Sequence, residues 1–454
     1  MSEPGPALVV VGRILTMDPD RPRVEAMLVV GDTVAVVGSV AEVRAAAAPG
    51  TPEDHVDGTL LPGFIDAHAH AQRAGLKALQ LVGPDAEARA FSAAMLADGD
   101  ADPDAPDWLG GEPPTLEDRV AAIRRVQPLL HAMGFTGVVD PAVSLPELEG
   151  WREAHRLGAL TLRVVAMPWP ELGTSAVPDV DAAFAVLDGI SGSTGAGDDW
   201  LRLGPVKVYH DGEGMKGEAL LERAWSGGDH GVRRISAEEF ARLAAGCVER
   251  GWGLGVHAVG SRAVTEVLDG LEAAGPPEVV AALRCQLVHA YLEPSAASME
   301  RAARLGVIAS LQPSIAWNNA AGLRARLGDR VSEVNPMRSW LEAGVVVAMG
   351  SDAPYFPFDP REVVPFAVSR RMRHMEDPEG PAQGISVLEA VDAYTRGAAH
   401  ASFADGRRGV LRAGALAYWV LLDVDPEWCS AEEFGRALVL HTVVGGRTVF
   451  RTEM

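Results

Sequence analysis

Residues 60–70 read LLPGFIDAHAH, an apolar run that ends in two histidines placed two positions apart. Seven more short apolar runs follow, and longer stretches with helical periodicity separate most of them. The predicted strands are 60–68, 136–142, 161–167, 204–210, 253–259, 285–291, 306–312 and 344–350. Strands that alternate with helices indicate βα units and a parallel sheet. The count of eight favours a (β/α)8 TIM barrel over the alternative, an open doubly wound sheet.

The two ends of the chain have a different pattern. Short runs of Val, Leu and Ile broken by turn residues predict hairpins at 7–38, and similar runs lie at 418–424, 437–443 and 447–451. Neither end has enough strands to bury a core alone. We therefore predict one small β-sandwich built from both termini, so that the domains are 1–59 and 406–454 for the two parts of the sandwich and 60–405 for the barrel.

The net charge of the chain limits the kinds of molecule that it can bind. The chain has 40 basic and 62 acidic residues, a net charge of −22. Such a surface repels phosphate backbones and anionic lipids, so we expect a small-molecule substrate, no nucleic acid and no membrane. Three scattered cysteines and the lack of a signal-peptide pattern predict a cytoplasmic protein. A homodimer is the default for a soluble enzyme.

Histidines and one aspartate lie at the predicted strand ends. His68 and His70 share one face, because side chains at i and i+2 of a strand point the same way. His257 and His289 end the fifth and sixth strands, and Asp352 follows the eighth. A barrel brings all five to one mouth. Imidazole and carboxylate are ligands of divalent metals, so we predict a metal site with zinc as the first choice and manganese, iron or cobalt as alternatives.

Lys207 lies inside the predicted fourth strand, in GPVKVYHDG. Burial lowers the pKa of a lysine, and a neutral amine reacts with carbon dioxide to give a carbamate that can bridge two metals. The other interpretation, which the residue pattern alone favours, is an ion pair with Asp211 or another acid.

Several motifs occur together in one order along the chain. They are LLPGFIDAHAH, VKVYHDG, HAVGSRAV, LVHA, SLQPS and MGSDAP, followed by ISVLEAVDAYTRGAAHAS. In this the sequence resembles the amidohydrolase superfamily, and its finer pattern resembles the amidohydrolase-3 branch that includes N-substituted formamide deformylases. The resemblance covers nearly the whole chain.

The resemblance implies a (β/α)8 barrel with a sandwich from both termini and a centre of one or two metal ions. His68 and His70 would hold one ion, and His257 and His289 the other. Carboxylated Lys207 would bridge them. Asp352 would contact the first ion and the hydrolytic water.

The sequence departs from the branch pattern at two motifs, and its segment between the HxH pair and the second strand is shorter than is common in the branch. Gly260, Ser261 and Arg262 stand where Gly-Asp-Arg is usual, and Ala417 and Tyr418 stand where Ala-Asp is usual. These departures concern the substrate more than the metal. The candidates for substrate contact are Asp211, Arg262 and Gln312.

The resulting expectation is a metal-dependent hydrolase of a carbon–nitrogen bond, in an amide or an N-acyl or N-formyl amine. Asp352 is expected to accept the proton of the attacking water and to return it to the leaving amine. The alternatives are a deaminase or cyclic amide hydrolase on the same barrel, and a non-catalytic scaffold. Glu266 lies nine positions after His257, farther than is typical of deaminases, and all the candidate ligands are present, which argues against a scaffold.

Overall fold

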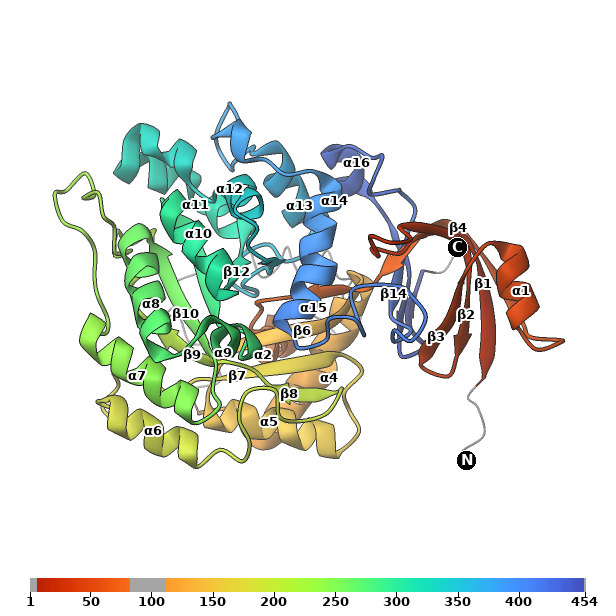
Figure 1. Cartoon of the computed structure of the whole chain (residues 1–454), viewed down its shortest axis with the longest axis horizontal. Helices are drawn as coiled ribbons and strands as arrows, with labels where there is room; N and C mark the ends of the chain where they lie inside the picture. Colours follow the sequence, from red (N-terminus) through yellow and green to blue (C-terminus); the bar gives the residue numbers. More distant parts are fainter. Residues whose placement is uncertain (1–5, 82–111, 453–454) are drawn as a thin grey trace.

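The computed structural model describes residues 6–81 and 112–452 (Figure 1). It is a mixed α/β structure. A group of strands and helices lies on the left of Figure 1, and a sheet that holds both ends of the described chain lies on the right. Within the described ranges, no helix has both the length and the apolar character needed to cross a bilayer.

The sheet on the right, which we call the terminal sheet, contains strands from both ends of the chain. Its seven strands follow the order β16-β15-β14-β4-β1-β2-β3. Their bounds are Ala7–Leu15 (β1), Arg23–Val30 (β2), Thr33–Gly38 (β3), Glu53–Pro62 (β4), Trp419–Leu422 (β14), Val439–Val444 (β15) and Arg447–Arg451 (β16). The two ends meet where β14 pairs antiparallel with β4, with Trp419 opposite Pro62. Neither end has enough strands to bury a hydrophobic core alone, so each end supplies strands that the other needs.

The remaining strands form two parallel sheets, ordered β13-β12-β11-β10-β9 and β5-β6-β7-β8. The bounds are Phe64–Asp66 (β5), Phe135–Val143 (β6), Arg163–Pro168 (β7), Leu201–Leu203 (β8), Val206–Tyr209 (β9), Leu254–Gly260 (β10), Gln286–Leu292 (β11), Ile308–Leu311 (β12) and Val347–Met349 (β13). All eight predicted strands overlap one of them, and only the short β8 was not predicted. A backbone hydrogen bond of 3.0 Å from Ala67 N to Met349 O links the ends of β5 and β13.

The first predicted run, 60–68, is divided between two sheets. Its beginning belongs to β4 of the terminal sheet and its middle to β5, with Gly63 between them. A Cβ at Gly63 would lie 2.2 Å from a methyl carbon of Thr136 on β6. The chain therefore passes from one sheet to the next at a point where only glycine fits.

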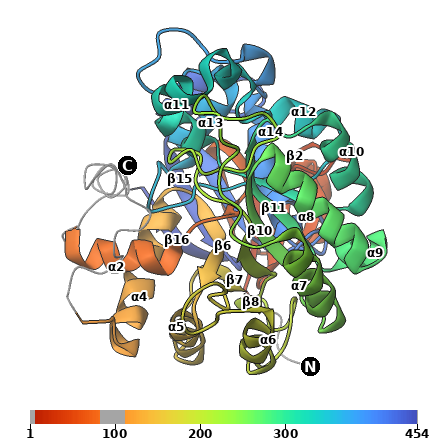
Figure 2. The ribbon, with the colours of Figure 1, turned by 90° about the vertical axis from the view of Figure 1, so that its left-hand side faces the viewer.

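Helices surround the parallel strands (Figure 2). Their bounds are Ala71–Leu81 (α2), Leu116–Ala132 (α4), Leu145–Arg156 (α5), Val180–Asp188 (α6), Ala237–Glu249 (α7), Ser261–Ala274 (α8), Pro277–Ala282 (α9), Ala296–Leu305 (α10), Pro313–Leu327 (α11), Met337–Glu342 (α12), Pro360–Ser369 (α13), Val387–Asp392 (α14) and Ala398–Ala401 (α15). Two short helices, Val40–Ala46 (α1) and Ala431–Arg436 (α16), accompany the terminal strands. Both α7 and α8 lie between predicted strands, where stretches with helical periodicity were expected. Ser236 and Glu239 form a capping box that begins α7, so its first turn satisfies its own backbone N–H groups.

Candidate metal centre

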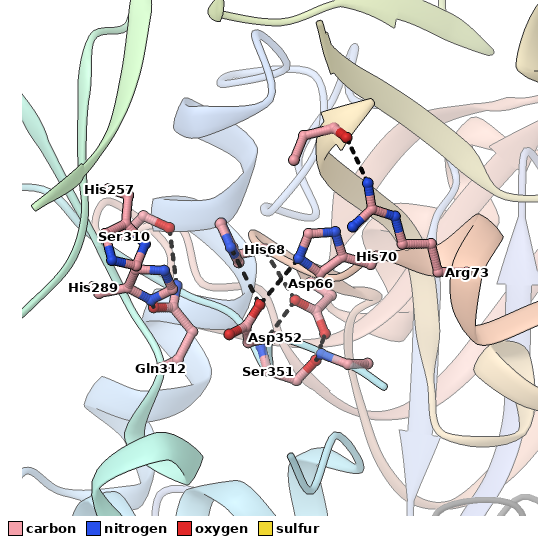
Figure 3. Close-up of polar contacts among 12 residues, drawn as sticks. Asp66, His68, His70, Arg73, His257, His289, Ser310, Gln312, Ser351 and Asp352 are labelled. Carbon is pink, nitrogen blue, oxygen red and sulfur yellow. Dashed lines mark hydrogen bonds and ion pairs between the residues drawn. The ribbon is translucent and has the colours of Figure 1, made fainter. Parts of the chain in front are cut away.

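The carboxyl ends of the parallel strands bring the predicted ligands together. His68 and His70 follow β5, His257 lies in β10, His289 lies in β11, and Asp352 follows β13. All five side chains are buried. Figure 3 shows the four imidazole rings and the carboxylate of Asp352 directed toward one another.

Two imidazoles converge on one carboxylate oxygen. His68 Nε2 lies 3.4 Å and His70 Nε2 lies 3.3 Å from Asp352 Oδ1. A tetrahedral ion with bonds of about 2.0–2.1 Å holds its ligand atoms about 3.3–3.4 Å apart. Ligand atoms of His68, His289 and Asp352 also lie within 4.8 Å of one another. The spacing therefore suits a small divalent ion.

The remaining histidines continue the cluster. The ring centroids of His68 and His289 are 5.1 Å apart, and those of His257 and His289 are 4.6 Å apart. In the part of the chain that the structure describes, His257 Nε2 is buried without a hydrogen-bond partner. Carboxylate oxygens of Asp211 and Glu213 lie 3.8 Å from this nitrogen, too far for a hydrogen bond. Buried polar atoms almost always have a hydrogen-bond partner, so a buried imidazole nitrogen without one, next to His289 and two carboxylates, fits a bound cation.

Burial sets the charge states that metal ligands need. It lowers the pKa of His68 to about 4 and holds the pKa of His257 and of His289 well below the usual range. Burial by itself would raise the pKa of Asp352, but hydrogen bonds to His68 and His70 outweigh it and the pKa lies well below its usual value. Near pH 7 these three imidazoles are therefore neutral and the carboxylate is ionised, as coordination requires.

Asp66 joins the two strand ends that carry these ligands. Its Oδ1 accepts hydrogen bonds from the backbone N–H groups of His68 (3.0 Å) and Ser351 (3.1 Å), and its Oδ2 accepts one from Ser351 Oγ (2.6 Å). Neither residue was predicted as a site residue, although Asp66 lies in the motif DAHAH and Ser351 in MGSDAP. A carboxylate that binds two backbone segments fixes the spacing between His68 and Asp352.

Gln312, predicted as a substrate contact, binds a candidate ligand. Its Oε1 lies 2.7 Å from His289 Nδ1, and its Nε2 donates to Ser310 Oγ at 3.2 Å (Figure 3). Because an amide oxygen only accepts, His289 carries its proton on Nδ1 and presents the lone pair of Nε2 to the cluster.

Two of the candidate ligands have unusual backbone conformations. His289 has a φ of 75° and Asp352 a φ of 59°, both in the left-handed region that non-glycine residues rarely adopt. Each such residue costs about 1–3 kcal/mol. Strain of this kind is typical of functional sites, where the surrounding contacts hold it in place.

Lys207 reaches the same cavity from β9. Its side chain is 1% exposed, and burial lowers its pKa to about 8. Asp352 and Glu213 act on it only through their charges, and the described residues provide no ion pair with Asp211, the partner that the alternative interpretation names. A share of the Lys207 amine is therefore neutral near pH 7.

The cluster opens into a cavity of about 560 Å³. Besides the candidate ligands and Lys207, its walls include the side chains of Arg73, Trp169, Tyr209, Glu213, Arg234 and Tyr355. The rings of Trp169 and Tyr209 meet edge to face with centroids 5.9 Å apart. None of these six residues was predicted as a site residue; Tyr209 lies in the motif VKVYHDG, and the other five lie outside the motifs that carry the family resemblance. The cavity combines aromatic surface with charged groups, which is typical of a small-molecule site.

The other two candidates for substrate contact, Asp211 and Arg262, do not line this cavity and form their contacts outside it. Asp211 accepts hydrogen bonds from the backbone N–H groups of Leu220, Val259 and Gly260, at 2.9–3.0 Å. Arg262 pairs with Glu266 at 3.1 Å on the surface of α8. The structure thus places Asp211 in the backbone scaffold under the site and Arg262 on an outer helix.

Comparison with known proteins identifies the class. A family model described as "Amidohydrolase family" matches residues 94–450, which is most of the chain. The chain therefore belongs to the amidohydrolase family.

Individual known proteins resemble this chain at less than 30% sequence identity. The chain is 29% identical over 257 residues to the protein LONG AFTER FAR-RED 3 of Arabidopsis thaliana, a match that covers 56% of this chain and 44% of that protein. It is 29% identical over 258 residues to the Bacillus subtilis protein YtcJ, of which 48% is covered, so the match spans about half of both relatives. It is 26% identical over 542 residues to an N-substituted formamide deformylase of Arthrobacter pascens, with 97% of each covered.

Solved structures share the fold. A protein described as an uncharacterized metal-dependent hydrolase from Pyrococcus horikoshii has a TM-score of 0.75 at 20% identity, covering 94% of this chain and 99% of that one. The atrazine chlorohydrolase TrzN of Arthrobacter aurescens, complexed with zinc, has a TM-score of 0.62 at 18% identity, covering 98% and 95%.

Proposed function

We propose that the protein is a metal-dependent hydrolase that cleaves the carbon–nitrogen bond of an amide or of an N-acyl or N-formyl amine. The observation that carries this proposal is the convergence of His68 Nε2 and His70 Nε2 on Asp352 Oδ1 at 3.3–3.4 Å. The relation to an N-substituted formamide deformylase over nearly the whole chain supports the substrate class.

The residues present suit one or two ions. His68, His70 and Asp352 would hold the first ion, and His257 and His289 the second, with Lys207 between them as a carbamate. A bound divalent ion lowers the pKa of water and polarises a carbonyl. Zinc is the proposed metal, which the zinc complex of a structural neighbour supports.

Asp352 is the proposed proton carrier. Its low pKa keeps the carboxylate ionised, and it lies among the candidate ligands at the wall of the cavity. It accepts a proton as the water oxygen bonds to the carbonyl carbon, and it returns that proton to the nitrogen as the carbon–nitrogen bond breaks. Water is divided between the two products, an acid and an amine.

The architecture proposed around this site is a closed (β/α)8 barrel with a β-sandwich domain from both termini, residues 1–59 and 406–454. The eight strands at the predicted places and the hydrogen bond between the ends of β5 and β13 support closure. The joining of β4 with β14 supports a shared terminal domain.

We also propose that the protein resides in the reducing cytoplasm and that it forms a homodimer. Three cysteines without disulfides, Cys247, Cys285 and Cys429, support the first part. Light scattering of the purified chain tests the second.

The decisive experiment measures metal and products together. Protein loaded with zinc or with manganese is given N-formyl amines, N-acyl amines, cyclic amides and aminated heterocycles. We expect one to two metal equivalents and release of an acid and an amine from N-acyl or N-formyl amines. Release of ammonia from the heterocycles would instead make the protein a deaminase. Full metal content in a His68→Ala, His70→Ala double variant would refute the proposed site.

A further inference from the structure

Two arginine side chains are buried at the opposite end of the parallel strands from the histidines. Arg163 is the first residue of β7, and Arg408 follows α15. They are 5% and 6% exposed. The Cζ of Arg163 lies 3.5 Å from the ring centroid of Trp200 and 5.1 Å from that of Tyr418, and the Cζ of Arg408 lies 5.1 Å from the ring of Tyr418. Both guanidinium groups thus flank one tyrosine ring.

Neither guanidinium has an acidic partner in the described part of the chain. In the ranges that the structure describes, no carboxylate forms an ion pair with Arg163 or Arg408, and the Nε atoms of both lack a hydrogen-bond partner. Among the described residues, the Arg408 side chain donates a hydrogen bond to Thr136 Oγ1, at 3.4 Å. Buried charges are normally paired, because burial of an isolated ion is costly.

Tyr418 does not neutralise the pair. Burial raises its pKa, so the phenol keeps its proton near neutral pH. Burial lowers the pKa of Arg408 only to about 10, so the guanidinium remains charged. The aromatic rings stabilise cations through their faces, but they carry no net charge.

The two side chains line a small cavity of about 30 Å³ together with Arg202, Arg407, Asp198 and Asp199. Asp199 pairs with Arg407 at 2.7 Å, and Asp198 accepts backbone N–H groups of Trp200 and Leu201. The lining therefore has two more positive than negative charges, in a protein whose net charge is −22. A cavity of this size holds one or two particles as large as water.

We propose that this cavity binds a single halide-sized inorganic anion, chloride under ordinary salt conditions, between the guanidinium groups of Arg163 and Arg408. Gly137 of β6 allows this arrangement, since a Cβ there would lie 2.3 Å from a terminal nitrogen of Arg408. Tyr418 immediately precedes β14 and Arg163 begins β7, so the anion joins the terminal sheet to the parallel strands. The site is structural and independent of the proposed hydrolysis.

The test uses thermal unfolding of the full chain in sodium chloride, sodium bromide and sodium gluconate at equal ionic strength. Gluconate is too large for the cavity. A ligand that binds only the folded state raises Tm with its concentration, so we expect chloride and bromide to raise the Tm of the wild type by about 2 °C or more relative to gluconate.

Matched variants separate binding from general salt effects. The double variant Arg163→Met, Arg408→Met should respond equally to all three salts. As a control, Arg436→Met removes an exposed arginine that pairs with Glu432 and does not line the cavity, and it should keep the halide effect. A halide effect of the same size in the double variant would overturn the proposal.

Diffraction gives a second measurement that needs no variant. Crystals of the wild-type protein soaked in bromide should show an anomalous peak between Arg163 and Arg408. A well-ordered cavity without such a peak at saturating bromide would also overturn it.

Discussion

At the residue scale, the orientation of His289 depends on a neutral side chain that is not itself a candidate ligand. Gln312 Oε1 receives the Nδ1 proton of His289 and so directs Nε2 to the cluster. Gln312→Leu removes that acceptor, and we expect metal affinity or activity to fall about 10- to 100-fold, the usual effect of losing such a partner. Gln383→Leu, which changes a glutamine bound to Ser339 outside the cluster, is the control. Metal titration of both variants checks the prediction, and equal affinities would contradict it.

We expect Asp352 to be more important for proton transfer than for binding of the metal. Asp352→Asn keeps an oxygen that can coordinate but loses the basic carboxylate. We expect it to keep much of the metal while kcat falls by a factor of about 10² or more. The measurement compares metal content, kcat and the acidic limb of the pH–rate profile with those of the wild type. A near-normal kcat with full metal would direct the search for the base to Glu213, the other acid that lines the cavity.

Asp140 makes stability depend on pH. Burial, with the charge of Glu147, raises its pKa to about 8, whereas an unfolded aspartate has a pKa of about 3.9. Between these values the folded state binds more protons than the unfolded state, so the free energy of unfolding falls as the pH rises. This one group contributes a slope of up to about 1.4 kcal/mol per pH unit.

The substitution Asp140→Asn removes the ionisation and keeps an acceptor for Trp151 Nε1, which Asp140 binds at 2.9 Å. We therefore expect the loss of stability between pH 5 and pH 8 to be smaller than in the wild type. Urea unfolding in metal-saturated buffer at several pH values measures it. Asp269→Asn, on the surface, is the control. Parallel pH profiles for Asp140→Asn and the wild type would refute the prediction.

At the scale of elements, the contact between the ends of β5 and β13 sets the distance between candidate ligands. Gly350 follows β13, and a Cβ there would lie 2.5 Å from the backbone nitrogen of His68. Gly350→Ala should push these ends apart and cost about 1–3 kcal/mol, with a matching loss of metal. Gly275→Ala, whose nearest atoms would lie 3.6 Å away, is the control. Thermal unfolding and metal analysis measure both effects, and unchanged metal content in Gly350→Ala would show that the contact does not position His68.

The predictability of these elements follows their physical character. Strands such as β10 and β11 are continuous apolar runs with a histidine near the carboxyl end, so the sequence pattern suffices to find them. The short β8 follows the turn at Asp198 and Asp199, and its three residues give too little pattern. The partners of Gln312 and the ring contact of Trp169 with Tyr209 depend on side-chain orientations that sequence spacing does not determine. The division of the first run at Gly63 required knowledge of Thr136, which lies more than seventy positions away.

At the scale of the whole molecule, the terminal sheet depends on both ends of the chain. β14 pairs with β4, and β15 and β16 extend the sheet beyond it. A chain that ends at residue 412 lacks all three strands and leaves the edge of β4 open. We expect this truncated chain to aggregate, as soluble yield and circular dichroism would show. Trp428→Ala, which changes a 75% exposed side chain in the same region, should remain folded. A soluble, cooperatively unfolding truncated chain would show that β1–β4 pack without their partners.

The pairing of Pro62 with Trp419 also has a consequence for synthesis on the ribosome. The two residues are 357 positions apart, and translation proceeds at about 5–20 residues per second. The ribosome therefore synthesises β14 about 20–70 s after β4. During that interval the nascent chain exposes an unpaired strand edge, to which other polypeptides can add. Slow translation of the stretch between them lengthens this exposure without changing any contact of the finished protein.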